Sequence, residues 1–353
     1  MRNTIILFLI ALALGAYVYF YEIKGGEQRK KEKEAAEKLL HFNKDSIDYV
    51  EISAPKGHFV FRKTDDGWQI EQPVKTDADD GPITGVLSNL SSAKKKRTFS
   101  VKKEKLDSYG LGSTALTVRL KQDDKFDQTV KMGDKTSVGS NVYTTIDDST
   151  VALIPSYIKN SANKSLFDWR YKKALHFPKG KIREITLKSP RGTFHFVKDG
   201  DQWLMTEPLN TKADKSKVDA ILNKLDWGVV KEVVAEEAKN LNRYRLNKPA
   251  YRVEMLSGEK ARYGVSFSSV KKNVSYGKDD ARPIIFKVDS IYLKPLNKRL
   301  FDYRTKDVTT FNRDQVDSLR LFFEDSLMVL HKDTSGVNWV FSDGKPAKNW
   351  KIT

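Results

Sequence analysis

Side chains that commonly perform catalysis are few in this chain, and they are scattered. The chain contains no cysteine, which excludes disulfides, cysteine-ligated zinc or iron–sulfur sites, a cysteine nucleophile and a lipid-modified N-terminal cysteine. Its five histidines lack the H-E-x-x-H pattern and the i, i+4 spacing that hold a zinc ion. They are His41, His58, His176, His195 and His331. We therefore expect neither a metal site nor histidine-based catalysis.

Serine and aspartate motifs give equally little support for catalysis. A chain this rich in lysine produces Ser-x-x-Lys by chance, as at Ser91–Lys94 and Ser161–Lys164, and the K-T-G and S-D-N elements that accompany it in penicillin-recognising enzymes are absent. Asp77, Asp79 and Asp80 lie close together, yet their spacing differs from that of a calcium-binding loop. A second copy of the same segment, described below, has Lys212 in place of Asp77, so helix capping explains these aspartates better. Neither glycine-rich phosphate-binding motif occurs, and no cofactor is predicted.

A dense group of basic residues is the strongest charge feature of a chain whose formal net charge is +17. Its members are Lys94, Lys95, Lys96, Arg97, Lys102, Lys103 and Lys105. They could attract an anionic polymer or lipid headgroups. The alternative is a solvated helix end and edge strand, which we favour because residues 229–237 of the second copy are acidic. Nucleic acid is not expected as a partner, because Phe99 is the one aromatic residue there.

The sequence repeats itself with a shift of 135 residues, from Trp68 to Trp203. The same shift maps a proline, a Thr-x-Ala-Asp segment and the apolar positions after it onto their counterparts. Two tandem modules are predicted, at residues 45–177 and 180–311. Residues 314–353 resemble the beginning of a third copy. We interpret them as a partial third repeat that is cut short, or as a meander that caps the second module. We expect no helix in this segment.

Hydrophobic periodicity predicts an α+β fold for each module. Alternating apolar residues around tight turns indicate a strand meander. A helix follows, with Asp79 and Asp214 at the N-cap positions and apolar residues spaced i, i+3, i+4, i+7 after each. Further alternating segments complete the pattern. We expect a mostly antiparallel sheet with helices on one face.

Residues 4–21 form an uncharged apolar run, close to the lower length limit for a membrane-spanning helix. We interpret residues 1–22 as a single transmembrane anchor, with a cleaved signal peptide as the alternative. Residues 23–44 are predicted to form a charged juxtamembrane helix or stalk. The lysines in that stalk, counted by the positive-inside rule, place the large domain in the cytoplasm unless they serve only as a solvated spacer.

Aromatic residues recur at equivalent positions in the copies. Trp68, Trp203 and Trp339 could stack on sugar rings, but each follows a turn at the start of a strand, and we expect core packing with the indole N–H on a loop carbonyl. A second element, Phe-Asp-aromatic-Arg, ends each module. It comprises Phe167, Asp168 and Arg170 in the first copy and Phe301, Asp302 and Arg304 in the second.

These end elements are predicted to form structural junctions in which the aromatic ring packs into the sheet and the guanidinium makes charge-assisted hydrogen bonds. On this interpretation Arg304→Ala would cost about 1 to 3 kcal/mol of stability, because buried partners would be left unpaired.

Taken together, these motifs resemble domain-of-unknown-function family 4340, an uncharacterised family of bacterial envelope proteins. The resemblance covers almost the whole chain from Asp45, twice over, and its motifs are structural. It implies an inner-membrane protein with the bulk of the chain extracytoplasmic, often associated with ABC-type export systems of the gliding-motility kind, and no assigned reaction.

Two classes of function remain open. The favoured one is a non-enzymatic accessory or scaffold protein with a protein partner in a membrane complex. The alternative is a hydrolase or transferase acting on an envelope polymer, with its site between the two modules. Carboxylates that converge between the modules would favour the second class.

Overall fold

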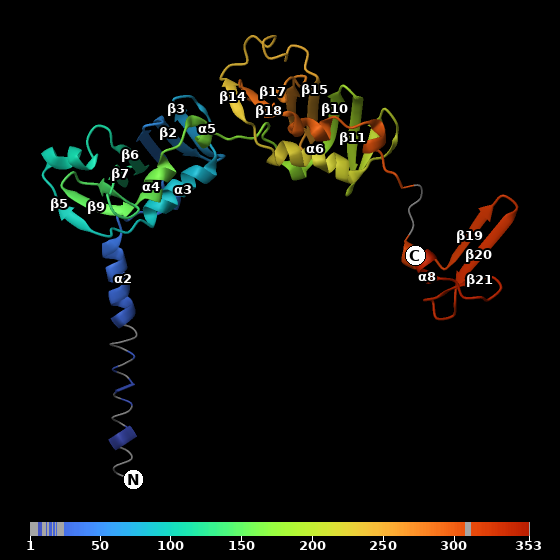
Figure 1. Ribbon diagram of the computed structural model, residues 1–353, viewed down its shortest axis with the longest axis horizontal. Helices are drawn as coiled ribbons and strands as arrows, with labels where there is room; N and C mark the ends of the chain where they lie inside the picture. The colour runs from blue at the N-terminus through green and yellow to red at the C-terminus, as the bar shows by residue number, and fades with distance from the viewer. Residues whose placement is uncertain are drawn as a thin grey trace.

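The computed structural model describes residues 25–307 and 312–352, together with residues 6–8, 12, 14, 15, 17 and 19 (Figure 1). Most of the predicted anchor at 1–22 lies outside the described residues. Among those that are described, no helix is both long enough and apolar enough to cross a membrane.

Helix α2 (Gly25–Glu37) falls within the predicted charged stalk and leads directly into the first module. Leu39 and Leu40, which follow it, are buried in the core of that module. The amide of Leu39 donates to the carbonyl of Ala93 (2.8 Å), and the amide of Lys95 donates to the carbonyl of Glu37 (2.7 Å). The end of the stalk is therefore hydrogen-bonded to the module.

The first module is a nine-stranded antiparallel sheet in the order β4-β3-β2-β1-β6-β7-β8-β9-β5. Its strands are β1 (Tyr49–Ala54), β2 (Gly57–Thr64), β3 (Gly67–Gln72), β4 (Thr76–Asp77), β5 (Thr98–Ser100), β6 (Leu116–Gln122), β7 (Phe126–Lys135), β8 (Asn141–Thr145) and β9 (Thr150–Pro155). Its helices are η2 (Lys44–Ser46), α3 (Asp80–Ser91), η3 (Lys103–Tyr109), α4 (Ser156–Ala162) and α5 (Leu166–Trp169).

The second module has the same topology, β13-β12-β11-β10-β15-β16-β17-β18-β14. Its strands are β10 (Ile182–Ser189), β11 (Gly192–Asp199), β12 (Gln202–Glu207), β13 (Thr211–Lys212), β14 (Glu232–Ala235), β15 (Tyr251–Ser257), β16 (Arg262–Phe267), β17 (Val274–Asp279) and β18 (Ile285–Asp289). Its helices are η4 (Lys179–Lys181), α6 (Lys215–Trp227), η5 (Ser290–Leu296) and α7 (Leu300–Tyr303). The predicted duplication of one α+β module is confirmed.

The first strand of each module lies inside its sheet, with a neighbouring strand on both edges. In the first module, Ile52 of β1 lies between Phe59 of β2 and Val118 of β6. In the second, Leu187 of β10 lies between Phe194 and Val253. The apolar stripe of α3 or α6 is buried in the core of its own module, as the helical spacing predicts. Each module therefore has its main core between its sheet and its helices.

Both long helices begin as the sequence predicts. The carboxylate of Asp79 accepts the amide of Gly81 (3.1 Å), and that of Asp214 accepts the amide of Ser216 (3.0 Å). These bonds satisfy amides that have no partner inside the helix.

The third segment is a three-stranded meander followed by the first turn of a helix. Its elements are η6 (Arg313–Gln315), β19 (Ser318–Phe323), β20 (Ser326–Lys332), β21 (Trp339–Phe341) and α8 (Asn349–Ile352). The expectation that no helix forms here is wrong. The amide of Trp339 donates to Asn349 (2.9 Å) as that of Trp68 donates to Asp80 (2.9 Å), so α8 starts where α3 starts in the first module.

Candidate functional site

The element that ends the first module, residues 167–170, contributes a buried aromatic side chain to that module's core. A reciprocal capping box between Ser165 and Asp168 starts α5, and the Ser165 hydroxyl holds the pKa of Asp168 below its ordinary value. Trp169 is fully buried against Phe59 and Phe61, with ring centroids 6.3 and 5.2 Å away. Phe167 instead packs against the core of the second module. The predicted junction is confirmed for this element.

Arg170 joins the two modules through a charge-assisted hydrogen bond. Its side chain is 3% exposed, and Nη2 donates to Glu236 Oε1 at 2.6 Å. Glu236 belongs to the acidic stretch 229–237 of the second module, and its acidity is the one signal in the sequence from which this partner could have been found. Nη1 is buried with no hydrogen-bond partner.

Arg282 of the second module holds the connecting segment in place. It pairs with the buried Asp279, and its Nη2 donates to the carbonyls of Lys173 (2.8 Å) and Ala174 (3.1 Å). Its guanidinium also lies over the ring of Tyr171, and burial raises the pKa of that tyrosine to about 12. No sequence pattern marks Arg282 as a junction residue, because the carbonyls that it binds in the connecting segment lie more than a hundred residues away.

The matching element of the second module differs from the prediction. Tyr303 is fully buried against Phe194 and Phe196, like Trp169. Arg304, however, is exposed and lies over Phe301, which is itself 55% exposed. The structure places no carboxylate on Arg304 within the described residues, because this position has no counterpart of the Glu236 segment. The junction role predicted for Arg304 is therefore wrong.

A pocket of about 600 Å³ lies beside the first junction. Its polar lining includes four carboxylates and the connecting segment, namely Asp66, Asp77, Asp79, Asp80, Tyr171, Lys173 and His176. Two of the carboxylates hold backbone amides, that of Asp79 at Gly81 and that of Asp80 at Trp68 (2.9 Å). No group of residues suited to a metal ion occurs in the described part of the chain.

The equivalent pocket of the second module, about 430 Å³, has different charges. Lys212 and Lys215 stand where the first module has Asp77 and Asp80, and Asp307 replaces Lys173. The fold therefore produces this hollow in both modules, at the start of the long helix, while its chemistry varies. Such divergence is typical of a structural feature rather than of a duplicated catalytic site.

The basic group of residues 94–105 spans the edge of the first sheet and the helix after it. Lys94 approaches Glu34 (3.9 Å) and Glu37 (4.0 Å) of the stalk, whereas Lys96 and Arg97 exchange backbone hydrogen bonds with Leu153. The other cations follow the edge strand β5 or lie on η3. They are Lys102, Lys103 and Lys105, and all three are exposed. This placement matches the solvated-edge alternative, and contact with an anionic surface stays a prediction.

The repeated tryptophans are core residues. Trp68, Trp203 and Trp339 are 6%, 1% and 6% exposed, so their faces are not available for sugar stacking. The indole N–H of Trp203 donates to the carboxylate of Asp219 on α6 (3.1 Å), not to the loop carbonyl that we expected. The strand is thereby tied to the helix above it.

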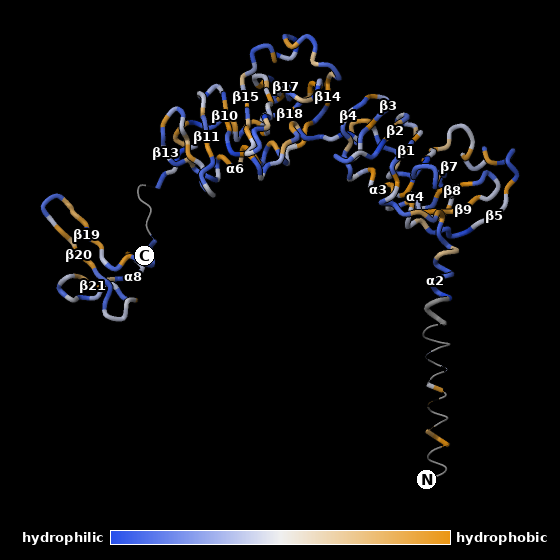
Figure 2. The backbone as a smooth tube through the Cα atoms, turned by 180° about the vertical axis from the view of Figure 1, so that it is seen from behind, coloured by the Kyte–Doolittle hydropathy of each residue, from blue (hydrophilic) through white to orange (hydrophobic). Residues whose placement is uncertain are grey.

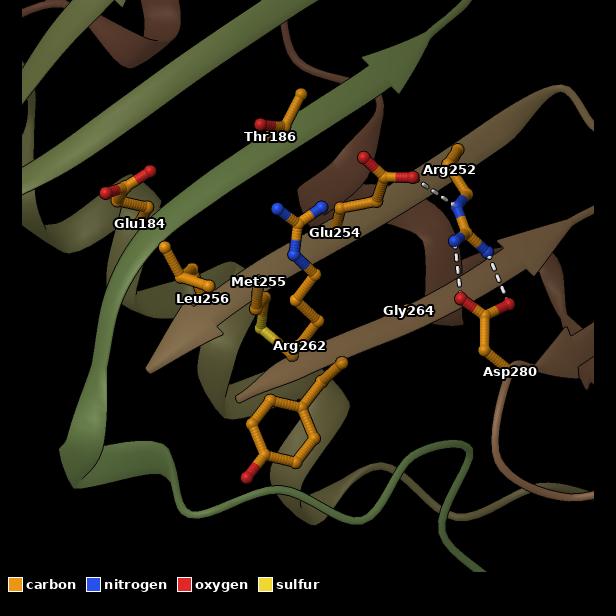
Figure 3. A pocket seen from close by; sticks show the side chains of 10 residues that line it. Glu184, Thr186, Arg252, Glu254, Met255, Leu256, Arg262, Gly264 and Asp280 are labelled. Atoms are coloured by element: carbon orange, nitrogen blue, oxygen red, sulfur yellow. Dashed lines mark hydrogen bonds and ion pairs between the residues drawn. The ribbon is translucent and has the colours of Figure 1, made fainter. Parts of the chain in front are cut away.

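A second hollow, about 320 Å³, lies on the face of the second sheet away from α6 (Figure 3). Arg252 makes a bidentate pair with Asp280 (2.7 and 2.5 Å) and reaches Glu254 (3.1 Å). Arg262 rises from β16 into the same space and has no ion pair in the described residues. Opposite charges therefore alternate across this hollow, which has no dominant sign with which to select a ligand.

The Arg252–Asp280 ion pair lies directly over Gly264, where any side chain would collide with it. A Cβ atom at this glycine would stand 2.1 Å from Asp280 Oδ2 and 2.6 Å from Arg252 Nη2. The hydrogen bonds from Arg252 hold the pKa of Asp280 below its ordinary value.

One protein-family model matches the chain twice, at residues 68–204 and 203–351, and its description is domain of unknown function (DUF4340). The chain belongs to the DUF4340 family. Each match starts at a tryptophan strand, β3 or β12; the first ends in β12 of the second module, and the second ends in α8 of the third segment. No curated protein and no solved structure matches the chain.

Arg170→Ala should lower the free energy of unfolding by about 1 to 3 kcal/mol, because it removes a buried charge-assisted bond between modules. Arg304→Ala, the matched control, should change it by less than about 0.5 kcal/mol, because Arg304 is exposed. Urea denaturation of both variants tests this, and equal losses would contradict the assignment of the junction to Arg170.

Gly264→Ala should separate Arg252 from Asp280 and so raise the pKa of Asp280 toward its ordinary value, as measured by NMR titration. A carboxylate with a lowered pKa stabilises the folded state above its unfolded pKa and loses that effect as the pH falls through the folded pKa. The variant should therefore be less stable than the parent at pH 7, by under about 1 kcal/mol for this half-exposed pair, and equally stable near pH 2. An unchanged titration would contradict the role given to Gly264.

Proposed function

We propose that this protein is a non-catalytic, membrane-anchored accessory or scaffold protein of the bacterial envelope, with the bulk of the chain extracytoplasmic and a protein partner in an ABC-type export or other envelope complex. The observation that carries the proposal is the third segment, residues 312–352, in which β19 has a neighbouring strand on one edge only among the described residues. It has the meander of a module and the first turn of its helix. The structure describes no strand on the other edge of β19.

Residues that are buried in the complete modules are exposed in this segment. Met328, opposite Leu321, is 41% exposed, whereas its counterparts Phe59 and Phe194 are each 1% exposed. Phe322 is 75% exposed where the second module has Lys188. Apolar residues along β19 and β20 are visible in Figure 2. Exposed apolar surface of this kind is typical of interaction sites.

The free edge of β19 can accept another strand. The amide of Lys332 donates to the carbonyl of Asp317 (2.9 Å). Because bonded pairs recur every second residue in an antiparallel ladder, the amides of Arg320 and Phe322 point away from β20. In the complete modules this edge pairs with β6 or β15, whose apolar residues alternate. This edge is therefore able to take up a strand of that pattern from a partner protein by β-strand addition.

Arg320→Pro removes an amide from the free edge and leaves the bonds to β20, whereas Arg320→Ala keeps that amide and serves as the control. With a photoreactive phenylalanine analogue at Phe322 of the full chain in native membranes, we expect a crosslink to a strand of another protein. Arg320→Pro should reduce its yield at least tenfold and Arg320→Ala less than twofold.

The same analogue at Val337, which is exposed in the turn before β21, controls for non-specific crosslinking. An equal yield from Arg320→Pro, an equal yield from Val337, or a product that contains only this chain would overturn the proposal.

The aspartates of the first junction pocket favour the second candidate, a hydrolase or transferase that acts on an envelope polymer. Asp77 lines that pocket beside His176. As a scaffold, the protein should keep full complementation with Asp77→Asn. Lost complementation with an unchanged fold and an unchanged Phe322 crosslink would favour the enzyme instead.

A further inference from the structure

A groove on the helical face of the second module combines an apolar floor with a basic rim. It lies between α6 and η5 and has a volume of about 530 Å³. Its apolar lining consists of Ala220, Trp227, Ile291 and Pro295, and its rim of Lys217, Lys224, Lys294 and Lys298.

Helical spacing produces this composition on α6. Lys217, Ala220, Lys224 and Trp227 recur at intervals of three or four residues, so they share one face. The stripe of α6 that is buried in the core begins at Val218 and lies on a different face. The groove is therefore built from positions that the module's own core does not use.

Gly228 brings η5 close to the end of α6. A Cβ atom at this position would stand 2.5 Å from the ring of Tyr292, so only glycine lets that buried tyrosine pack beneath the helix end. Tyr292 in turn places Ile291 and Lys294 at the mouth of the groove. The width of the groove is thus fixed by backbone packing.

The rim of the groove has an excess of positive charge. Within the described residues, none of the four rim lysines forms an ion pair with a carboxylate. Lys179 adds a fifth cation, with Nζ 4.6 Å from the centre of the Trp227 ring. Trp227 and Ile291 are 67% and 65% exposed beside these cations. The carboxamide oxygen of Asn223, in the lining, is buried without a hydrogen-bond partner.

The first module provides an internal comparison. The positions equivalent to Lys217, Lys224 and Trp227 hold Pro82, Asn89 and Ser92. The duplicated fold therefore does not require this composition, which is specific to the second module.

We propose that this groove binds an anionic phospholipid at a membrane surface, with one acyl chain along the apolar floor and the phosphate among the lysines. An exposed tryptophan beside lysines is the composition of membrane-interfacial surfaces, and the excess of lysines in the lining favours an anionic headgroup. At about 30 Å³ per small group, the volume holds on the order of fifteen to twenty methylene-sized groups, which suits one chain. This binding is independent of a strand partner at β19.

The test uses the full chain in vesicles of phosphatidylcholine that contain a small fraction of photoreactive phosphatidylglycerol, with the diazirine in the acyl chain. Mass spectrometry locates the crosslinks. We expect crosslinks in the peptides that contain Trp227 and Ile291, at a yield at least fivefold above that with photoreactive phosphatidylcholine. Equal yields from the two lipids, or crosslinks confined to residues 1–24, would overturn the proposal.

Two variants and a control separate the groove from general surface charge. Lys294→Gln/Lys298→Gln should lower the yield at these peptides at least fivefold, and Trp227→Ser, which introduces the first-module residue, should lower it at least threefold. Lys102→Gln/Lys103→Gln removes the same charge elsewhere and should change the yield less than twofold. An equal effect of both lysine pairs would show general electrostatic attraction and overturn the site.

Inorganic phosphate at millimolar concentration offers the headgroup chemistry without the chain, and it should leave the yield unchanged within twofold. Loss of the crosslink with phosphate would show a plain anion site and would also overturn the proposal. Thermal unfolding of each variant verifies that its fold is retained. Because the Phe322 crosslink is read separately, failure of this proposal is distinguishable from failure of the strand-partner proposal.

Discussion

Each module depends on the burial of its first strand between two neighbouring strands and beneath one helix. β1 and β10 satisfy this requirement within the chain, because β6 or β15 occupies the second edge. Exposure of apolar side chains to water is costly, and an unpaired strand edge readily pairs with another strand. In β19 and β20 this constraint is met only in part, since Met328, which corresponds to buried residues of the complete modules, is exposed. The proposal of a partner strand rests on this comparison.

Duplication preserved the framework of the module and changed the chemistry on its surface. Trp169 and Tyr303 are buried in the equivalent cores of the two modules. The arginines that follow them differ, because Arg170 is buried against Glu236 whereas Arg304 is exposed over Phe301. The pocket at the start of the long helix carries four aspartates in the first module and several lysines in the second. The lysine-rimmed groove has its aromatic and most of its cations only in the second copy. The surfaces at which the two modules differ are therefore the ones whose chemistry the shared fold does not require.

Much of the fold was predictable because it depends on local patterns. The shift from Trp68 to Trp203 predicted the duplication, and period-two and period-3.6 spacing predicted the strands and the helices that cover them. Asp79 and Asp214 cap helices because an N-cap bond joins residues only two or three positions apart. The candidate sites were less predictable. The sequence pointed to residues 94–105, whereas the lysines at 217, 224, 294 and 298 are far apart along the chain and meet only when η5 packs against α6.

The sequence by itself determined the module, its duplication, its helix caps and the aromatic residues that fill its cores, since these follow from short-range periodicity and side-chain volume. Only the tertiary structure decided which arginine joins the modules, because Arg170 and Arg304 occupy identical local motifs and differ in what approaches them from elsewhere in the chain. It likewise decided that Arg282 binds carbonyls of the connecting segment. Long-range contacts of this kind depend on where separate elements pack, and no local pattern encodes that placement.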